Sequence, residues 1–332
     1  MSEQTMRAAW FESFGPADEV LILGEKPKPE PGPGEVLVRL ETTGVNPSDV
    51  KKRAGAFPSL LDEGYVIPHS DGAGVIHAVG DGVAADRIGE RVWVYQAQYG
   101  RRFGTAAEYV ALDQQRAVRL PDNASMAIGA CLGIPIMTAH RCVFADGPVK
   151  GQTLLVTGGA GRVGYYAIQW AVRAGARVIA TASNAVDRDL CLELGAQGVV
   201  NHREPEWSSK VLEINNGVRV DRVIDVEFGA NLPEIIKVIR TSGVITTYSS
   251  TQVREPSLPF LQMMFMDLTI RMVIVYAMPE EAKQEAIEAI NSALSSERLQ
   301  HRIAHELPFE DMARSHQMIE RAGFGGCLVV KV

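Results

Sequence analysis

The stretch Thr153-Leu-Leu-Val-Thr-Gly-Gly-Ala-Gly-Arg-Val-Gly164 decides the fold of this chain. Its first five residues predict a buried strand, the glycines predict a tight turn, and residues 165–174 predict a helix. Glycines in such a turn let the backbone approach a pyrophosphate, and the helix N-terminus offers it free N–H groups. The segment therefore favours a dinucleotide-binding turn over a purely structural one. The expected coenzyme contacts here are Gly158, Gly161 and Gly164, with Arg162 as a further phosphate contact.

Strands and helices alternate on both sides of this segment. Alternation of this kind implies βαβ units and a parallel sheet that is covered on both faces, so we predict an α/β, doubly wound Rossmann domain. A helix is expected over 187–194, where Gly195 would end it, and an amphipathic helix over 280–297. Residues 125–144 predict a helix that Pro135 kinks or ends. The further strands are expected at 177–181, 199–200, 222–226, 243–247 and 271–275.

The first third of the chain has a different pattern. Short β-branched runs at 36–40, 75–79 and 91–95 are separated by glycine and proline, which is typical of a barrel or a sandwich. Residues 27–34 hold four prolines and two glycines, which exclude a helix there. The last residues, 327–332, predict a strand that returns to this first domain.

Composition limits the classes of function. The chain has 332 residues, of which 46% are hydrophobic, and 33 basic residues against 40 acidic ones give a net charge of −7. An acidic balance disfavours nucleic acid or a membrane surface as the main partner. The chain has no apolar run of about 18 residues and no signal-type leader, so we expect neither a membrane span nor secretion. The four cysteines are scattered without a CxxC pair, and we expect a reduced, cytoplasmic protein.

The choice of coenzyme depends on the end of the second predicted strand. NAD is normally marked there by a carboxylate that accepts bonds from the ribose hydroxyls, and residues 181–184 contain none. Ser183, Arg188 and His202 instead offer donors or cations, which suit the 2′-phosphate of NADPH. For Arg188, and for Arg203 nearby, a solvated surface position is an equally good interpretation.

Several segments together resemble the medium-chain dehydrogenase/reductase superfamily, and within it the zinc-free quinone oxidoreductase (zeta-crystallin-like) branch. The resemblance covers essentially the whole chain. It implies a GroES-like catalytic domain over 1–124, a Rossmann NADPH-binding domain over 125–276, and a C-terminal segment, 277–332, that returns to the catalytic domain. The segments that carry it are Gly44-Val-Asn-Pro-Ser-Asp49, Ser70-Asp-Gly-Ala-Gly74 with Val79-Gly80, Gly104-Thr-Ala-Ala-Glu-Tyr-Val110, residues 130–141 and Val200-Asn-His-Arg-Glu204.

Ligand chemistry argues against a metal. Zinc-using relatives place a thiolate, a His-Glu pair and a lobe of four cysteines where this chain has Asn46, Ser70-Asp71 and no such lobe. Zinc prefers thiolate and imidazole ligands, and His69 with Asp71 is the one tempting pair nearby. We interpret His69 as a satisfied polar residue and predict no metal.

The resemblance also implies roles for individual residues. Asn46 would lie near the nicotinamide or the substrate carbonyl, Val163 would help to cradle the pyrophosphate, and Ser183 and His202 would lie at the adenosine phosphate. Lys51 stands where the branch commonly has a tyrosine, so its ammonium is a candidate donor to the substrate oxygen. A solvated lysine beside Lys52 and Arg53 is the competing interpretation. The alternative donors are Tyr65, Tyr95 and Tyr99.

Hydride transfer without a Lewis acid suits acceptors that are already electrophilic. The leading hypothesis is therefore an NADPH-dependent reductase of a quinone or a conjugated enone or enal. The alternative hypothesis is an NADPH-binding protein with a non-catalytic role, either RNA-binding or structural. We expect a small-molecule substrate and a homodimer or homotetramer; the methionine-rich run 261–267 suits core or subunit packing.

Overall fold

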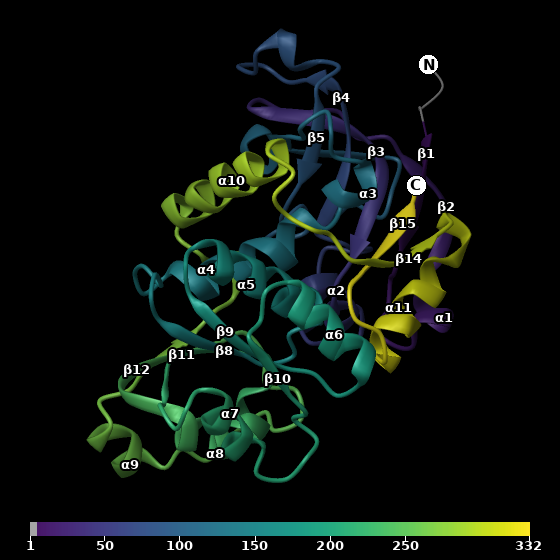
Figure 1. Ribbon diagram of the computed structural model, residues 1–332. Helices are drawn as coiled ribbons and strands as arrows, with labels where there is room; N and C mark the ends of the chain where they lie inside the picture. Colours follow the sequence, from purple (N-terminus) through teal and green to yellow (C-terminus); the bar gives the residue numbers. More distant parts are fainter. Residues whose placement is uncertain (1–4) are drawn as a thin grey trace. The chain divides into compact units, whose positions relative to one another are not determined.

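The computed structural model describes residues 5–332, and the chain divides into two compact units. Unit 1 comprises the residues up to 134 together with 287–332, and unit 2 comprises 135–286. Each unit is described by itself below (Figure 1). The sequence predicts functional domains that end at residues 124 and 276. These limits differ from those of the compact units and remain a prediction.

Unit 2 contains a six-stranded sheet in the order β10-β9-β8-β11-β12-β13, and every neighbouring pair in it is parallel. This order is that of a doubly wound sheet and confirms the predicted Rossmann fold. The central strand is apolar on both faces, with Leu154, Leu155 and Val156 fully buried, because helices cover both sides. The strands are β8 (Thr153–Val156), β9 (Arg177–Thr181), β10 (Gly198–Val200), β11 (Val220–Asp225), β12 (Ile239–Thr247) and β13 (Thr269–Met272).

Helices α4 (Met137–Phe144) and α5 (Arg162–Arg173) lie on one face of this sheet, and α7 (Trp207–Ile214) and α8 (Phe228–Val238) lie on the other (Figure 1). The helical stretch expected over 125–144 is interrupted at Pro135, as predicted: Pro135 lies inside a π-helical turn, Leu132–Ile136, between α3 (Met126–Gly129) and α4. The remaining helices are α6 (Ala185–Glu193), α9 (Phe260–Phe265) and α10 (Glu280–Ser295).

Unit 1 is β-rich, as the first third of the sequence predicts. Its main sheet has the order β14-β15-β3-β4-β5-β7, with β6 also paired to β3, and a separate pair is formed by β1 and β2. The C-terminal strand β15 pairs antiparallel with β3 and parallel with β14. The strands are β1 (Thr5–Trp10), β2 (Ile22–Pro27), β3 (Glu35–Val45), β4 (Asp71–Val79), β5 (Arg91–Val94), β6 (Tyr109–Asp113), β7 (Ala117–Arg119), β14 (Ile303–Leu307) and β15 (Cys327–Lys331).

Besides α3 and the second half of α10, unit 1 contains the helices α1 (Ala17–Val20), α2 (Pro47–Arg53) and α11 (Met312–Arg321). Helix α2 follows β3 directly, with Asn46 at its N-cap and Pro47 at its first position, where a proline costs no hydrogen bond. The connection thus places the first residues of α2 at the end of the longest strand of the sheet.

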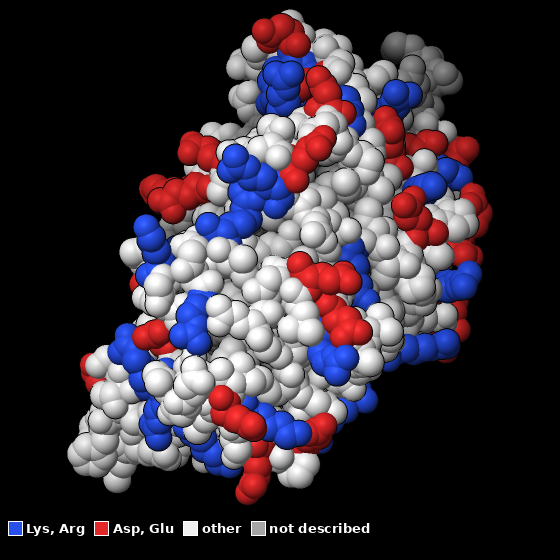
Figure 2. All heavy atoms as spheres, in the orientation of Figure 1, with Lys and Arg blue, Asp and Glu red and all other residues white. Residues whose placement is uncertain are grey.

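All four cysteines are buried and free. Among residues 5–332, no helix is long and apolar enough to cross a membrane. Lys and Arg are interspersed with Asp and Glu over the face shown in Figure 2.

Candidate coenzyme site and candidate catalytic cluster

The glycine loop of unit 2 connects β8 to α5. Gly161 is the N-cap of α5, and Gly158 has a φ of +61°, a left-handed conformation that side chains disfavour. A Cβ on Gly164 would lie 2.2 Å from the carbonyl oxygen of Gly158, so a side chain there would displace the loop. The loop therefore has the close backbone packing, and α5 the half-buried N-terminus, that suit a pyrophosphate.

Both neighbouring strands hold this loop. Thr181, at the end of β9, accepts hydrogen bonds from Gly158 N through its hydroxyl and from Gly159 N through its carbonyl, both at 2.9 Å. Thr157 donates its hydroxyl to Asp225 Oδ1, at the end of β11, over 2.8 Å. The loop is thus fixed at the carboxyl edge of the sheet, where the strand order reverses and ligands bind in folds of this type.

Asp225 is a buried carboxyl at this edge, and sequence reasoning did not single it out. It also accepts a hydrogen bond from Asn231 Nδ2 at 2.8 Å. Burial raises the pKa of Asp225 to about 6, although the bonds from Asn231 and Thr157 favour its charged form. Its position as a carboxyl near the end of the strand expected over 222–226 was the signal that could have found it.

The structure brings two of the predicted adenosine contacts to one edge of the sheet. Thr181 at the end of β9 pairs with Val200 at the end of β10. Ser183 comes two residues after Thr181, and His202 comes two residues after Val200, so both leave the sheet at the same edge. The Nδ1 atom of His202 is buried without a hydrogen-bond partner among the described residues, and burial lowers the pKa of its ring. A buried ring nitrogen that lacks a partner fits a residue that awaits a ligand.

Arg188, the third predicted phosphate contact, lies elsewhere on this surface. It is exposed in α6, and its guanidinium donates to Asp189 Oδ1 over 2.9 Å. Ser183 and His202 therefore lie together at the strand ends, whereas the guanidinium of Arg188 is paired with the carboxylate of Asp189. A role for Arg188 at the coenzyme stays a prediction.

In unit 1, Asn46 lies in a buried polar group that we call the Asn46 cluster: Asn46, Asp49, Lys52, Asp71 and Gln98. The side chain of Asn46 donates from Nδ2 to Asp71 Oδ2 over 2.9 Å, and its backbone N donates to Asp49 Oδ2 over 2.8 Å. Asp71 Oδ2 accepts a second bond from the backbone of Ile134 at 2.9 Å. Asn46 is therefore held in one orientation at the start of α2.

The two adjacent lysines of α2 have different environments. Lys51, our predicted catalytic lysine, is exposed, whereas Lys52 is only 7% exposed. Lys52 Nζ donates to both the carbonyl oxygen and Oε1 of Gln98, at 2.8 Å each. Sequence reasoning passed over Lys52, although its i,i+3 spacing from Asp49 on a capped helix was a signal that the two share a face.

Burial shifts the ionisation of this cluster toward the neutral forms. It raises the pKa of Asp71 to about 8 and that of Asp49 to about 6. It also lowers the pKa of Lys52, while the charges of Asp49 and Asp71 act in the opposite direction. A buried carboxyl with such a pKa exchanges protons in the pH range in which enzymes work, which is typical of functional sites.

His69 lies beside this cluster and is fully buried. Its Nδ1 is 2.9 Å from the hydroxyl of Thr43, and its Nε2 is 2.9 Å from Nε2 of His316 in α11. Burial lowers the pKa of His69 to about 3 and that of His316 well below its usual range, so both rings are neutral. Both nitrogens of His69 thus have protein partners.

The described part of the chain, residues 5–332, contains no group of three His, Cys, Asp or Glu side chains that could hold a metal ion. A metal-free reaction stays a prediction. Of the three candidate tyrosines, Tyr95 is 1% exposed, Tyr99 is 48% exposed, and Tyr65 is half-buried against Phe103. The geometry does not select one of them.

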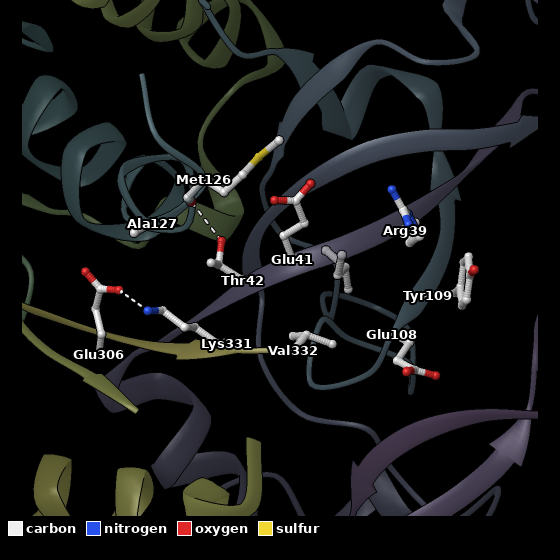
Figure 3. A pocket seen from close by; sticks show the side chains of 11 residues that line it. Arg39, Glu41, Thr42, Glu108, Tyr109, Met126, Ala127, Glu306, Lys331 and Val332 are labelled. Carbon is white, nitrogen blue, oxygen red and sulfur yellow. Dashed lines mark hydrogen bonds and ion pairs between the residues drawn. The ribbon is translucent and has the colours of Figure 1, made fainter. Parts of the chain in front are cut away.

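A hollow of about 830 Å³ opens elsewhere in unit 1 (Figure 3). It lies along β3 and the C-terminal strand, and Lys331 and Glu306 form an ion pair of 3.2 Å on its wall. None of the predicted site residues lines it. Its wall mixes charges of both signs with apolar side chains and indicates no particular ligand.

Two domain families match the chain. Residues 32–122 match the alcohol dehydrogenase GroES-like domain, and residues 163–292 match the family described as zinc-binding dehydrogenase. Both belong to the medium-chain dehydrogenase/reductases, which pair a β-rich domain with a Rossmann domain, as units 1 and 2 do.

Full-length relatives narrow this class. The quinone oxidoreductase of Homo sapiens is 28% identical over 330 residues, which are 99% of this chain and 98% of that protein. A chloroplastic quinone-oxidoreductase homolog of Spinacia oleracea is 30% identical over 253 residues, covering 72% of this chain and 75% of its own. A mycobacterial protein solved in complex with NADPH superposes with a TM-score of 0.86 at 26% identity, covering 98% of this chain and 100% of that one. The chain therefore belongs to the quinone oxidoreductase branch of the medium-chain dehydrogenase/reductase superfamily, as the sequence motifs predict, and is an oxidoreductase of that superfamily.

Proposed function

We propose that this protein is a zinc-independent reductase that uses NADPH to reduce a quinone or a conjugated enone or enal. The observation that carries the coenzyme part is the carboxyl edge of the sheet in unit 2: a loop with no room for a side chain at Gly164, and a buried His202 Nδ1 that has no partner among residues 5–332. The names of the full-length relatives and the NADPH in a similar solved structure support it.

The residues of unit 2 fit this coenzyme. The N–H groups around Gly161 and Arg162 would bind the pyrophosphate, and His202 and Ser183 would donate to the 2′-phosphate. Residues 181–184 offer no carboxylate to repel that phosphate. Bound NADPH would supply the hydride.

In unit 1, Asn46 would donate its amide to the acceptor oxygen. Addition of a hydride to a quinone or an enone places negative charge on that oxygen, and a proton then completes the reduced product. A donor that is already fixed stabilises this charge without reorganisation. The bond from Asn46 Nδ2 to Asp71 leaves the second hydrogen of the amide for the substrate.

Fluorescence titration with NADPH and NADH tests the coenzyme. We expect NADPH to bind at least tenfold more tightly, and His202→Ala to remove most of this preference while leaving NADH affinity unchanged. Equal affinities for the two coenzymes in the wild type would contradict the proposal.

NADPH oxidation with a panel of quinones, enones and enals tests the reaction. Turnover is expected without added metal and unchanged by chelators, and elemental analysis should find no stoichiometric zinc. One zinc per chain would overturn zinc independence. Intact NADPH binding without turnover of any acceptor would favour the non-catalytic role.

We also propose that two copies of the chain pair through the edge of the sheet in unit 2. β13 is the last strand of its sheet, and large apolar side chains beside it are exposed, including Met272 at 72% and Phe265 at 79%. An open strand edge can pair with the same edge of a second copy about a two-fold axis. Light scattering should give the mass of a homodimer or a homotetramer, and Met272→Lys should lower that mass. Ile88→Lys, at another exposed apolar residue, should not.

A further inference from the structure

Asp225 is a buried carboxyl at the end of β11, the strand that lies between β8 and β12 in the sheet of unit 2. Its Oδ1 accepts hydrogen bonds from the Thr157 hydroxyl and from Asn231 Nδ2, both at 2.8 Å. Its Oδ2 accepts the backbone N–H of Glu227 at 3.1 Å. One carboxyl group thus joins the start of the glycine loop, the connection after β11 and helix α8.

The partners of Asp225 favour its ionised form. All three bonds are donated to the carboxyl group, and a carboxylate can accept them all, whereas a carboxylic acid or an amide would turn a hydrogen of its own toward one of the donors. The next oxygen, Thr247 Oγ1, is 3.5 Å from Oδ2, which is longer than the about 3 Å of an O–H···O bond. Asp225 is 0% exposed, so bulk water does not replace a lost partner.

Thr157 is the first residue of the glycine loop and is bonded to the end of β11 three times. Its backbone N donates to the carbonyl oxygen of Ile224 at 2.9 Å, and its hydroxyl accepts the backbone N–H of Val226 at 3.0 Å. Because the hydroxyl oxygen is occupied by that N–H, its own hydrogen is directed to Asp225 Oδ1. A Cβ on Gly158 would lie 3.0 Å from Cγ1 of Val226, so the same connection packs against the next residue of the loop.

The titratable groups around Asp225 come from three elements. Glu227 follows it on the same connection, and its charge opposes that of Asp225. Cys142 of α4 and Tyr248, which follows β12, are neutral, because burial raises the pKa of the thiol and of the phenol. None of these three groups is a cation, so the hydrogen bonds are what favour the carboxylate. Burial raises the pKa of Asp225 to about 6, which leaves it ionised above neutral pH and protonated in mild acid.

We propose that Asp225 is a positioning residue for the coenzyme: its carboxylate, through the Thr157 hydroxyl, holds the glycine loop in the conformation that receives the pyrophosphate. This inference rests on the proposed function, which assigns the loop to NADPH. Asp225 is fully buried and acts through Thr157, so it is not itself a phosphate ligand. A proton on the carboxyl group, or an amide in its place, removes an acceptor and releases the start of the loop.

Calorimetric titration with ADP-ribose measures this effect. ADP-ribose carries the pyrophosphate of the coenzyme and lacks the 2′-phosphate, a group that would titrate near about pH 6. Thr157→Val removes the hydroxyl and nearly keeps the shape of the side chain. It should weaken ADP-ribose binding about tenfold at pH 7.5, because a hydrogen bond to a charged group is lost. Asp225→Asn should weaken it by a similar factor, and Thr157→Ser, which retains the hydroxyl, should stay within about twofold of the wild type.

The pH dependence distinguishes positioning from a general loss of structure. At pH 5 the wild-type Asp225 is itself mostly protonated, so the deficit of Thr157→Val relative to the wild type should shrink from about tenfold at pH 7.5 to about twofold. A general structural defect would weaken binding by the same factor at both pH values. The double variant Thr157→Val/Asp225→Asn should bind no more weakly than the weaker single variant, because both substitutions remove the same bond.

Thr246→Val and Asp221→Asn are the matched controls. The hydroxyl of Thr246, on β12, is buried and has no hydrogen-bond partner among residues 5–332, so its removal breaks no bond. Asp221 lies at the opposite end of β11, where it accepts the backbone N–H of Thr153 at 2.8 Å. Neither substitution should change ADP-ribose affinity at pH 7.5 or at pH 5.

Hydrogen exchange in the ligand-free protein measures the loop itself. The amides of Gly159 and Gly161 donate to the carbonyl oxygens of Thr181 and Gly158, both at 2.9 Å. In Thr157→Val these two amides should exchange at least about tenfold faster, while the amides of α10 keep their wild-type rates. If Asp225→Asn does not fold, Thr157→Val decides, because it leaves the carboxyl group in place.

The outcomes separate this inference from the proposed function. If the wild type binds ADP-ribose but reduces no quinone, enone or enal, the reductase proposal fails, and the titrations still decide the role of Asp225. If Thr157→Val binds ADP-ribose as tightly as the wild type, or has the same deficit at pH 5 and pH 7.5, only the inference is overturned. A wild type that binds neither NADPH nor ADP-ribose would overturn both.

Discussion

The glycine loop of unit 2 and the Asn46 cluster of unit 1 are constructed in opposite ways. The loop depends on backbone atoms and on missing side chains, as the close approach of Gly164 to the Gly158 carbonyl shows. The cluster depends on buried polar side chains from separate parts of the chain, with Asn46 bonded to Asp71 and Lys52 bonded to Gln98. A backbone site tolerates few side chains at its glycines, whereas a side-chain site is sensitive to the charge of each member.

The largest effect is expected from Gly164→Val. Its Cβ would lie 2.2 Å from the carbonyl oxygen of Gly158. Because that oxygen belongs to the backbone and cannot rotate away as a side chain could, the loop has to move. Overpacking of this kind costs about 1–3 kcal/mol. Because the displaced backbone is the proposed pyrophosphate contact, a cost of about 2 kcal/mol on binding would give about thirtyfold weaker NADPH binding. Fluorescence titration measures the binding, and thermal unfolding reports whether unit 2 remains folded.

Gly32→Ala is the control for this substitution. Its Cβ would meet only a flexible carboxylate, at 3.4 Å from Glu35 Oε2, so NADPH binding should not change. Tight NADPH binding by a folded Gly164→Val variant would show that coenzyme binding does not depend on this loop. The glycine loop would then not be the backbone site that we contrast with the Asn46 cluster.

Asn46→Ala is expected to lower kcat/KM about tenfold or more. The loss of one donor to a developing oxyanion costs about 2.7–4 kcal/mol in other enzymes, and a quinone should cost less because its charge is delocalised. A loss of about 1.4 kcal/mol corresponds to the tenfold effect. Single-turnover rates with NADPH already bound measure the chemical step. An unchanged rate with intact NADPH binding would mean that Asn46 only supports the start of α2.

A smaller effect, on stability, is expected at the buried histidine pair. The folded-state pKa of His69 is about 3 and that of His316 is lower than usual, so the stability due to the neutral pair is complete above about pH 6.5 and is lost as the pH falls below it. Because each ring binds a proton in the unfolded state and not in the folded state, each should lower the free energy of unfolding by about 0.7 kcal/mol between pH 7 and pH 6. His316→Gln should therefore reduce the loss of unfolding free energy between pH 7 and pH 6 by about 0.7 kcal/mol relative to the wild type in urea unfolding, and His77→Gln, at an exposed ring, should leave that loss unchanged.

The smallest effect is expected from Lys51→Ala. Lys51 is exposed on α2, so its removal should lower kcat/KM by less than Asn46→Ala does. The same steady-state assay compares the two variants. A loss at Lys51 that exceeds the loss at Asn46 would make this exposed lysine the main donor.

The sequence allowed the fold and the coenzyme loop to be predicted because both depend on local patterns. The strand before Gly158 and the helix after Gly161 are consecutive, and Gly195, with a φ of +99°, ends α6 where the pattern predicts an end. The interruption expected at Pro135 within residues 125–144 is confirmed, but its form, a π-helical turn over Leu132–Ile136, could not be predicted from the proline alone.

The Asn46 cluster could be predicted only in part, because its members come from segments that are far apart in the sequence. Asn46 was found through its motif, but the burial of Lys52 depends on Gln98, which is far from it in the sequence. The i,i+3 spacing from Asp49 places Lys52 on the same helix face as that carboxyl, but this spacing alone does not show that the face is buried. His202 was identified as a donor, yet its unpartnered nitrogen becomes visible only when β9 and β10 pair.

The pairing of β15 with β3 has a consequence for biosynthesis. Residues 287–332 follow the whole of unit 2 in the chain, so a ribosome completes unit 2 before it releases the last strands of unit 1. Until then, β3 keeps an open edge on the nascent chain, and such edges recruit chaperones or pair with other chains. Premature termination before Cys327 would therefore leave a folded coenzyme unit attached to a β-sheet that lacks its closing strand.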